Sequence, residues 1–330
     1  IKGRSLLTGL PVRVNVSTAD LYEPVMRLSE QIGTAAHQVL EKTPPELAGD
    51  IYRNGVMLTR FHESCHLPSG MRFYLRDSKS GSYWNITDPS LTSAVTFETA
   101  QAVFAHERFQ VETTLRLFVN PLDGAALACV TLKNQSPMER MMEVCSYLEP
   151  ALAPQRDDAA HPAFQNLFIR TERMQKYGVQ ALRRSREPKE APRRLWHTMA
   201  TNASLTMVRV QTDRTAFLGR GRTFHAPRAL ELPISATADT LGDIIEPCLS
   251  VRGQFVLPPN GQLQFVFATL MPGANEKASA FLERYGQADV ALRCYEPALT
   301  QGLVTARYLG LTPGMQADVS RLVGALAYAG

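Results

Sequence analysis

A glycine–arginine turn is the first place in this sequence where residue types and spacing suggest chemistry. The run Gly219-Arg220-Gly221-Arg222 resembles a phosphate cradle, in which backbone N–H groups surround an anion. It lacks the Gly-Lys-Ser/Thr ending of a P-loop and the third glycine of a dinucleotide-binding fingerprint. We therefore favour a tight turn after a strand.

A second candidate is a group of metal-ligand residue types, His62, Cys65 and His66. Two histidines four residues apart share a metal only if they lie on one face of a helix. The flanking residues, 60–61 and 68–70, are typical of a strand and a turn instead. We expect neither a metal site nor a cofactor, and the sequence contains no Gly-x-Ser-x-Gly elbow and no His-Glu-x-x-His helix.

Carboxylates are the third candidate, because glycoside chemistry needs two carboxyl groups around the scissile bond, or one acid with phosphate as nucleophile. No pattern in the sequence brings two of them together, and we expect most at exposed strand or loop positions. We therefore assign no catalytic residue. The carboxylates considered are Glu143, Glu149, Asp157, Asp158 and Glu172.

Aromatic residues favour sugar binding, since the C–H faces of pyranose rings stack on flat side chains. Tyr83 and Trp84 follow a Ser-Gly-Ser turn, and Trp196 stands beside His197. Either Trp is a possible platform. Half-buried packing inside a sandwich is the alternative for each of them.

The elements that must position these residues follow the order helix, long β region, helical tail. Residues 19–40 have apolar side chains every three or four positions, which predicts a helix that ends before Pro44-Pro45. Residues 54–269 contain many short strands separated by Gly, Pro, Asn and Asp, which indicates a large antiparallel sandwich. Three more helices are expected at 276–285, 289–309 and 315–328.

The strand patterns differ in how many faces they bury. Residues 110–120 alternate apolar and polar side chains, 127–132 are nearly apolar on both faces, and 138–147 alternate again. Residues 251–257 and 263–269 are expected to pair as a hairpin around Pro258-Pro259-Asn260-Gly261.

Composition excludes several function classes. The formal net charge is +4, from 35 Lys and Arg against 31 Asp and Glu, and the surplus is too scattered to indicate nucleic-acid binding. The densest basic stretch, within 183–194, is expected to be a solvated loop. Five widely spaced cysteines indicate free thiols, with Cys129 and Cys145 packed as small hydrophobes. No apolar run is long enough to span a membrane, and no signal peptide opens the chain.

Several segments between residues 124 and 328 resemble one known family. They are SYLE at 146–149, DAAHPAFQNLF at 158–168, TDRTAFLGRGR at 212–222 and IIEPCLSVR at 244–252. They are similar to motifs of the glycosyltransferase-36 type supersandwich domain, which occurs in glycoside hydrolase family 94 phosphorylases and in cyclic β-1,2-glucan synthases. Residues 50–123 match more loosely, and the glycine-rich hairpin usual in the family is replaced by residues 58–70.

The resemblance implies a fold and a domain order. The fold is mainly β, a large antiparallel supersandwich of the galactose-mutarotase type. The expected order is an N-terminal linker helix region at 1–49, the supersandwich at 50–273, and a helical linker at 274–330 that leads toward an (α/α)6 barrel. Since the first residue is Ile1 and the last residues form an apolar helical run, we expect a piece of a longer protein.

The resemblance also implies a function. The expected role is a non-catalytic accessory domain of a cyclic β-1,2-glucan synthase that positions β-glucan chains or supports the catalytic barrel. Its partners would be a β-glucan oligosaccharide and the rest of the parent polypeptide. The parent would lie at the cytoplasmic side of a bacterial inner membrane, with this part soluble. The expected carbohydrate contacts are Tyr83, Trp84, His161, Trp196, Arg220 and Arg222.

Two alternatives remain open at this point. The chain is the N-terminal half of a β-glucoside phosphorylase that transfers glycosyl groups to phosphate, or it is a structural or dimerisation scaffold without affinity for sugar. A general acid on a downstream barrel would favour the first. An aromatic-poor concave face would favour the second.

Overall fold

The protein is represented by a computed structural model that describes residues 2–4, 11–13, 52–53, 56–60, 70–88, 94–185, 192–312, 314–316 and 318. The chain divides into two compact units, Ile1–Thr43 and Pro44–Gly330. In the first unit, β1 (Lys2–Arg4) pairs with β2 (Pro11–Arg13) in antiparallel fashion. The helix predicted at 19–40 lies outside the described residues.

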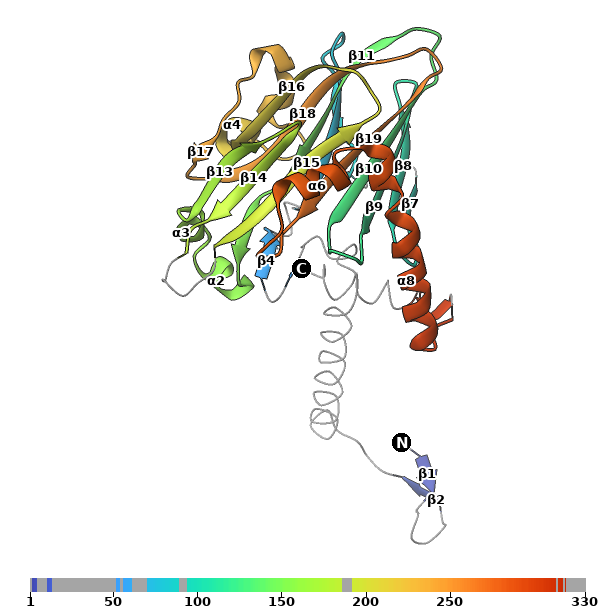
Figure 1. The fold of residues 1–330 in the computed structure, drawn as a ribbon. Coiled ribbons are helices and arrows are strands. Elements are labelled where there is room, and N and C mark those ends of the chain that lie inside the picture. The colour runs from blue at the N-terminus through green and yellow to red at the C-terminus, as the bar shows by residue number, and fades with distance from the viewer. Residues whose placement is uncertain are drawn as a thin grey trace. The chain divides into compact units, whose positions relative to one another are not determined.

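The second unit is built on a nine-stranded antiparallel sheet (Figure 1). Neighbouring strands along it are β17 (Gly242–Asp243), β13 (Ile169–Met174), β14 (Gly178–Arg183), β15 (Arg193–Thr201), β19 (Gln262–Leu270), β10 (Ala126–Asn134), β9 (Val111–Val119), β8 (Ala102–Arg108) and β7 (Ala94–Phe97).

Two smaller antiparallel sheets complete the β structure. The five-stranded sheet has the order β16 (Leu205–Asp213), β18 (Pro247–Leu257), β11 (Arg140–Tyr147), β5 (Arg72–Asp77) and β6 (Tyr83–Asn85). The three-stranded sheet has the order β12 (Pro150–Ala153), β4 (Val56–Thr59) and β3 (Tyr52–Arg53). The predicted mainly β, antiparallel fold is confirmed.

The central strands are apolar on both faces because each face meets a different layer. Along β10, Ala128 and Val130 belong to the core shared by the sheets, while Leu127 and Cys129 between them belong to a second core. Successive strand side chains point to opposite faces, so one strand fills both cores. The buried run predicted at 127–132 is confirmed.

Helices cover the outer face of the nine-stranded sheet (Figure 1). They are α6 (Ala278–Tyr285), α7 (Ala288–Leu292) and α8 (Tyr295–Tyr308). Tyr285 fixes α6 to the β9–β10 turn, because its hydroxyl donates to Asp123 at 2.7 Å and accepts from Asn120 Nδ2 at 2.7 Å. The pKa of Tyr285 is raised, first by burial and then by the hydrogen bond to Asp123, while the hydrogen bond from Asn120 acts in the opposite direction.

The predicted helix at 289–309 is two helices. Pro297 lies in the first turn of α8, where its missing N–H costs nothing, but its ring does not allow the helix to continue from α7. Of the helix predicted at 315–328, only 315–316 and 318 are among the described residues. In the described part of the chain, no helix is long and apolar enough to cross a membrane.

Short helices cover the outer face of the five-stranded sheet. They are α4 (Arg214–Leu218), α5 (Arg228–Glu231) and the 3-10 helix η1 (Ile234–Ala236), and we call residues 214–236 the covering segment. Phe217, Phe224 and Leu230 from this segment pack with Tyr74 and Tyr147 of the sheet. Two further helices, α2 (Gln155–Ala160) and α3 (Pro162–Asn166), follow β12.

The hairpin predicted at 251–269 is wrong. β18 lies in the five-stranded sheet and β19 in the nine-stranded sheet, so the Pro258–Gly261 turn carries the chain from one layer to the other. Asn134 Nδ2 donates to the Pro258 carbonyl at 3.0 Å and holds the turn. Turn residues predicted the reversal correctly, but they do not determine which strand each arm will pair with.

The basic stretch at 183–194 is also not a simple solvated loop. Arg183 and Arg193 are paired residues of β14 and β15, and residues 186–191 lie outside the described part. Arg183 is buried, its guanidinium lies 5.3 Å from the Phe168 ring centroid, and its Nη2 donates to Gln165 at 2.5 Å. Its charge is therefore used inside the fold.

Candidate functional site

The candidate site is the exposed side of the covering segment, and a buried ion cluster fixes that segment to the sheet. Glu143 on β11 accepts from Arg252 Nε at 2.8 Å and from Arg76 Nη1 at 3.0 Å. The same guanidinium groups donate to main-chain carbonyls of the segment, Arg76 to Leu230 at 2.9 Å and Arg252 to Ala229 at 2.6 Å. The fully desolvated carboxylate therefore orients two arginines that hold the segment in place.

The covering segment begins with a helix cap. Asp213 accepts from the backbone N–H groups of Thr215 at 2.8 Å and Ala216 at 3.2 Å, which satisfies two free donors at the start of α4. Among the described residues, Asp213 forms no ion pair with Arg214 or Arg222. Arg214 instead pairs with Glu149, with Nε to Oε1 at 2.9 Å, and with Glu246.

The Gly219–Arg222 run is a tight turn, as predicted, but it follows the short helix α4 and not a strand. Gly219 and Gly221 have φ of +87° and +71°, where an L side chain is strained. A Cβ on Gly219 would lie 2.9 Å from Arg228 Cβ and 3.0 Å from Arg222 Cδ. The glycine therefore lets two arginine side chains lie against the same point of the backbone.

An ion pair lies at the exposed edge of this turn, with Tyr83 nearby. Arg222 Nη1 donates to Glu231, and the two side chains are 37% and 42% exposed. Tyr83, half-buried on β6, has a raised pKa, first because of burial and then because of the Glu231 carboxylate, while Arg222 acts in the opposite direction. Tyr83 packs against the apolar side chains of the covering segment, near enough to Arg222 for its charge to act on the phenol.

His225 lies further along the same segment. Its Nδ1 is 2.9 Å from Asp88 Oδ2, and its side chain is 56% exposed. The neighbouring Phe224 is buried, with the Arg72 guanidinium 5.3 Å from its ring centroid. Sequence reasoning missed His225, because only the fold brings it beside a buried carboxylate.

The two predicted tryptophan platforms are wrong. Trp84 is 2% exposed and its Nε1 donates to His106 Nε2 at 3.1 Å. Trp196 is 1% exposed, packs against Phe281 of α6, and donates to Gln180 Oε1 at 3.1 Å. Both rings lie inside the packed layers, so a sugar cannot stack on either of them.

The remaining predicted contacts, His161 and Arg220, lie in different places. Arg220 is exposed between the two glycines of the turn. His161 is exposed between α2 and α3, at the lower left of Figure 1, whereas α4 lies at the upper left. His161 and Arg220 therefore belong to different parts of the fold.

The carboxylates considered for acid–base chemistry all have cationic partners. Glu143, Glu149 and Asp158 are buried rather than exposed as expected, the last paired with Arg60 at 2.5 Å. Asp157 and Glu172 are partly exposed beside arginines of their own helix or strand. None of the buried three is accessible to a substrate.

One buried constellation resembles a catalytic arrangement without access to substrate. His197 Nε2 lies 2.8 Å from Ser146 Oγ, and its Nδ1 lies 2.9 Å from Thr269 Oγ1. All three side chains are at most 1% exposed. Burial lowers the pKa of His197 to about 3, so the imidazole is neutral near neutral pH. In the described part of the chain, no group of three potential ligands could hold a metal ion.

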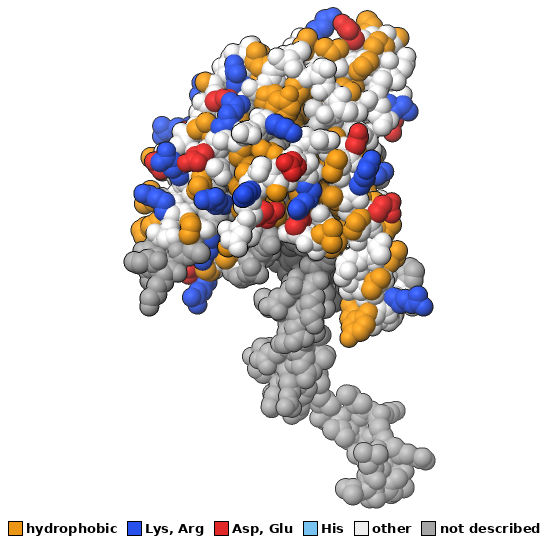
Figure 2. Space-filling model, in the orientation of Figure 1, with side chains coloured by type: hydrophobic (Ala, Val, Ile, Leu, Met, Phe, Trp, Pro, Cys, Tyr) orange, Lys and Arg blue, Asp and Glu red, His pale blue; other side chains and the backbone are white. Residues whose placement is uncertain are grey.

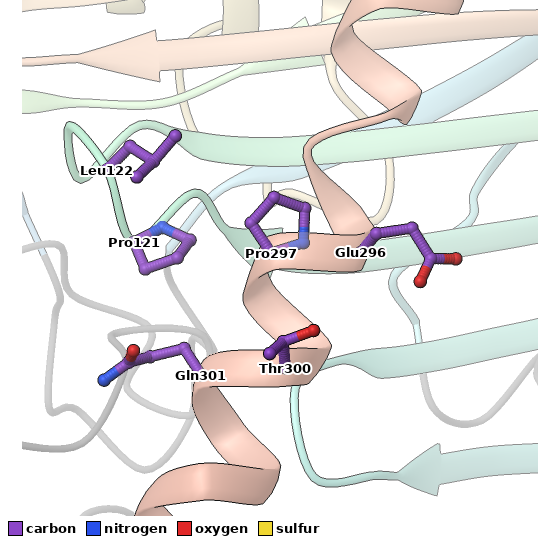
Figure 3. A pocket seen from close by; sticks show the side chains of 6 residues that line it. All are labelled: Pro121, Leu122, Glu296, Pro297, Thr300 and Gln301. Atoms are coloured by element: carbon purple, nitrogen blue, oxygen red, sulfur yellow. The ribbon is translucent and has the colours of Figure 1, made fainter.

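A surface pocket lies on the outer face of the nine-stranded sheet, between the β9–β10 turn and α8. Its volume is about 580 Å³. Figure 3 shows Pro121 and Leu122 of the turn across from Pro297 of α8. Further along α8, Leu303, Val304 and Tyr308 are exposed, the last at 88%.

Comparison with known proteins gives two matches to families. Residues 50–288, more than half of the chain, match the glycosyl hydrolase 94 supersandwich domain. Residues 1–79 match the MreB/Mbl protein family, so residues 50–79 fall within both matches. The sequence alone predicts only a linker helix region at residues 1–49.

Individual relatives include a glucan synthase and a cell shape-determining protein. The chain is 27% identical over 290 residues to the cyclic β-(1,2)-glucan synthase NdvB of Rhizobium meliloti, covering 85% of this chain and 10% of the relative. It is 44% identical over 59 residues to the cell shape-determining protein Mbl of Bacillus cereus, covering 18% of each. The chain thus spans only a small part of the length of both relatives.

Solved structures are more distant. A bacterial glucoamylase complexed with acarbose aligns with a TM-score of 0.42 and 11% identity, covering 77% of this chain and 36% of the glucoamylase. A putative kojibiose phosphorylase from the human microbiome aligns with a TM-score of 0.31 and 9% identity, covering 87% and 36%.

Proposed function

Because the chain belongs to the glycosyl hydrolase 94 supersandwich domain family, we propose that it is a non-catalytic accessory domain of a glucan-synthesising protein. We propose that it contacts β-glucan through the covering segment. The observation that carries this is the cluster of Tyr83, Arg222 and Glu231, which is partly exposed and has a rigid base.

The chemistry of the cluster suits a neutral sugar. A guanidinium and a carboxylate offer donors and acceptors to adjacent hydroxyl groups, and a tyrosine offers both a polar hydroxyl and an apolar ring. The Glu143 ion cluster fixes the backbone beneath, so little conformational entropy is lost when a ligand binds. A domain of this kind raises the local concentration of glucan near a neighbouring active site.

The inaccessibility of the buried carboxylates supports the non-catalytic role. Glycosyl transfer needs an acid that reaches the glycosidic oxygen, and Glu143, Glu149 and Asp158 are occupied inside the fold. We propose that an (α/α)6 barrel elsewhere in the parent supplies the acid. The division into 1–49, 50–273 and 274–330 and a parent at the cytoplasmic side of a bacterial inner membrane belong to the same proposal.

Support of a neighbouring domain is a second candidate, favoured by the exposed face of α8. Leu303, Val304 and Tyr308 are more than half exposed on a helix whose opposite side packs on the sheet. Burial of such side chains against a second domain would stabilise the contact by about 25 cal/mol per Å² of apolar area. This role needs no affinity for sugar.

Calorimetric titration with linear β-1,2-gluco-oligosaccharides separates the two candidates, with cello-oligosaccharides as the linkage control. Saturable binding is expected in the β-1,2 series, and Tyr83→Ala should weaken it. Tyr177→Ala is the matched control, because Tyr177 is a partly exposed tyrosine outside the cluster. A flat titration of correctly folded protein would leave only the supporting role.

A further inference from the structure

The covering segment carries more positive charge than its own carboxylates neutralise. Residues 214–236 contain four arginines and one carboxylate, Glu231, and Asp213 immediately precedes them. Asp213 caps α4, and Glu231 pairs with Arg222. Arg214 is neutralised from outside the segment by Glu149 and Glu246.

Arg220 and Arg228 have no carboxylate within ion-pair distance among the described residues. Both are exposed. An unpaired guanidinium at a surface is ordinary. Here, however, the side chains of Arg222 and Arg228 both lie against Gly219, and Arg220 directly follows that glycine. An anion bound at this turn would offset the positive charges of Arg220 and Arg228, which have no ion-pair partner among the described residues.

The backbone leaves room for such an anion. A Cβ on Gly221 would meet nothing within 4 Å, so the space beside the turn is open. Within the described part of the chain, the amide N–H groups of Arg220 and Gly221 make no main-chain hydrogen bond. Successive free N–H groups at a turn with left-handed residues are a common way of holding an oxyanion.

We propose that Arg220, Arg222 and Arg228 form a binding site for a phosphate-type oxyanion. Guanidinium groups match the geometry of tetrahedral oxyanions through paired N–H donors, which neutral sugars do not require. The ligand is either free phosphate or a phosphate ester. This proposal concerns the same segment as the proposed function, and it holds or fails separately from the binding of neutral glucan.

The test is calorimetric titration of the full chain with inorganic phosphate and, separately, with glucose 6-phosphate, at an ionic strength fixed with sodium chloride. We expect saturable binding of at least one of them, and at least about tenfold weaker binding to R220A/R228A. Tighter binding of inorganic phosphate would identify the free ion as the ligand. Tighter binding of the hexose phosphate would identify an ester.

The matched control is R156A/R170A, which removes two positive charges at exposed positions outside the covering segment. Its affinity should stay within about twofold of the wild-type value, since screening limits the effect of distant charges. Absence of saturable binding to the wild-type chain would overturn the proposal. Equal losses in both double variants would also overturn it, because the binding would then reflect net charge alone.

Discussion

Glu143 and Arg252 form a buried ion pair across the neighbouring strands β11 and β18, with 2.8 Å between Oε2 and Nε. Neither side chain is more than 5% exposed. The pair has Arg76 as a third member, and together they connect the five-stranded sheet to the covering segment. The candidate site therefore depends on a polar cluster that lies beneath it.

Glu143→Ala should destabilise the protein strongly. The substitution leaves two buried guanidinium groups without their anion, which costs about 3–5 kcal/mol of unfolding free energy. Denaturant unfolding measures this, and Glu112→Ala is the control. Glu112 is 48% exposed and lies 3.9 Å from Lys133, so its loss should cost at most about 1 kcal/mol. Equal costs for the two variants would contradict the structural role given to Glu143.

His197 should make stability fall in mild acid. Its native pKa of about 3 lies below the ordinary value of 6.5, because burial disfavours the charged imidazolium. The unfolded chain therefore binds more protons between those values, and the contribution is present above pH 6.5 and lost as pH falls toward 3. Within this window the loss approaches about 1.4 kcal/mol per pH unit.

His197→Gln isolates that contribution. Glutamine does not titrate and keeps a polar atom near Ser146. Unfolding free energies measured from pH 7 to pH 4 should decline less steeply in the variant than in the wild type, whatever the variant's own stability at pH 7. Parallel curves would mean that His197 is not buried as a neutral imidazole.

Replacing Trp196 should change stability and leave sugar binding intact. Trp196→Phe removes part of a buried ring and its hydrogen bond to Gln180 Oε1. We expect a loss of about 1–3 kcal/mol in unfolding free energy. Affinity for β-1,2-gluco-oligosaccharides, measured well below the midpoint of thermal unfolding, should not change. A loss of affinity for the oligosaccharides without a loss of stability would show that Trp196 does stack on sugar.

The Mbl-like stretch, residues 1–79, should be separable from the rest of the chain only in part. Deletion of residues 1–43 removes one compact unit and should leave the unfolding transition of the remainder nearly unchanged. Deletion of residues 1–60 also removes β4, whose Val56 and Leu58 are buried in the core, and Arg60, which pairs with Asp158. The longer deletion should abolish cooperative unfolding, as followed by calorimetry. Identical behaviour of the two would show that β4 is dispensable.

Much of the fold could be predicted, because strand periodicity reports burial directly. The alternation predicted at 110–120 corresponds to β9. Cys129 and Cys145 pack as small apolar residues, as predicted. Burial raises the pKa of these thiols to about 12 and about 11, and so keeps them protonated. The placement of β18 and β19 in different sheets could not be predicted, because a tight turn between two strands fits either arrangement and no local pattern distinguishes the sheets. Figure 2 likewise shows Lys and Arg side chains interspersed with Asp and Glu on the face in view, as the scattered charge predicted.

The candidate site could be predicted only through its motif. The glycine–arginine run identified the turn, but the proximity of Tyr83 to Arg222 joins segments far apart in sequence. Trp84 and Trp196 were predicted as sugar platforms because of their aromatic rings. Their burial could not be predicted, because a single tryptophan in a sequence looks the same whether it lies at the surface or in the core. The Mbl-like stretch has no physical signature beyond a helical period, and only comparison with a second family reveals it.

The most direct test of the central claim is hydrogen exchange with and without a saturating β-1,2-gluco-oligosaccharide. Bound glucan should slow amide exchange in residues 219–231, and it should leave residues 155–167 around His161 unchanged. Slower exchange confined to 219–231 is the result that the account predicts. Slower exchange elsewhere, with the covering segment unaffected, would contradict the placement of the glucan surface on this segment.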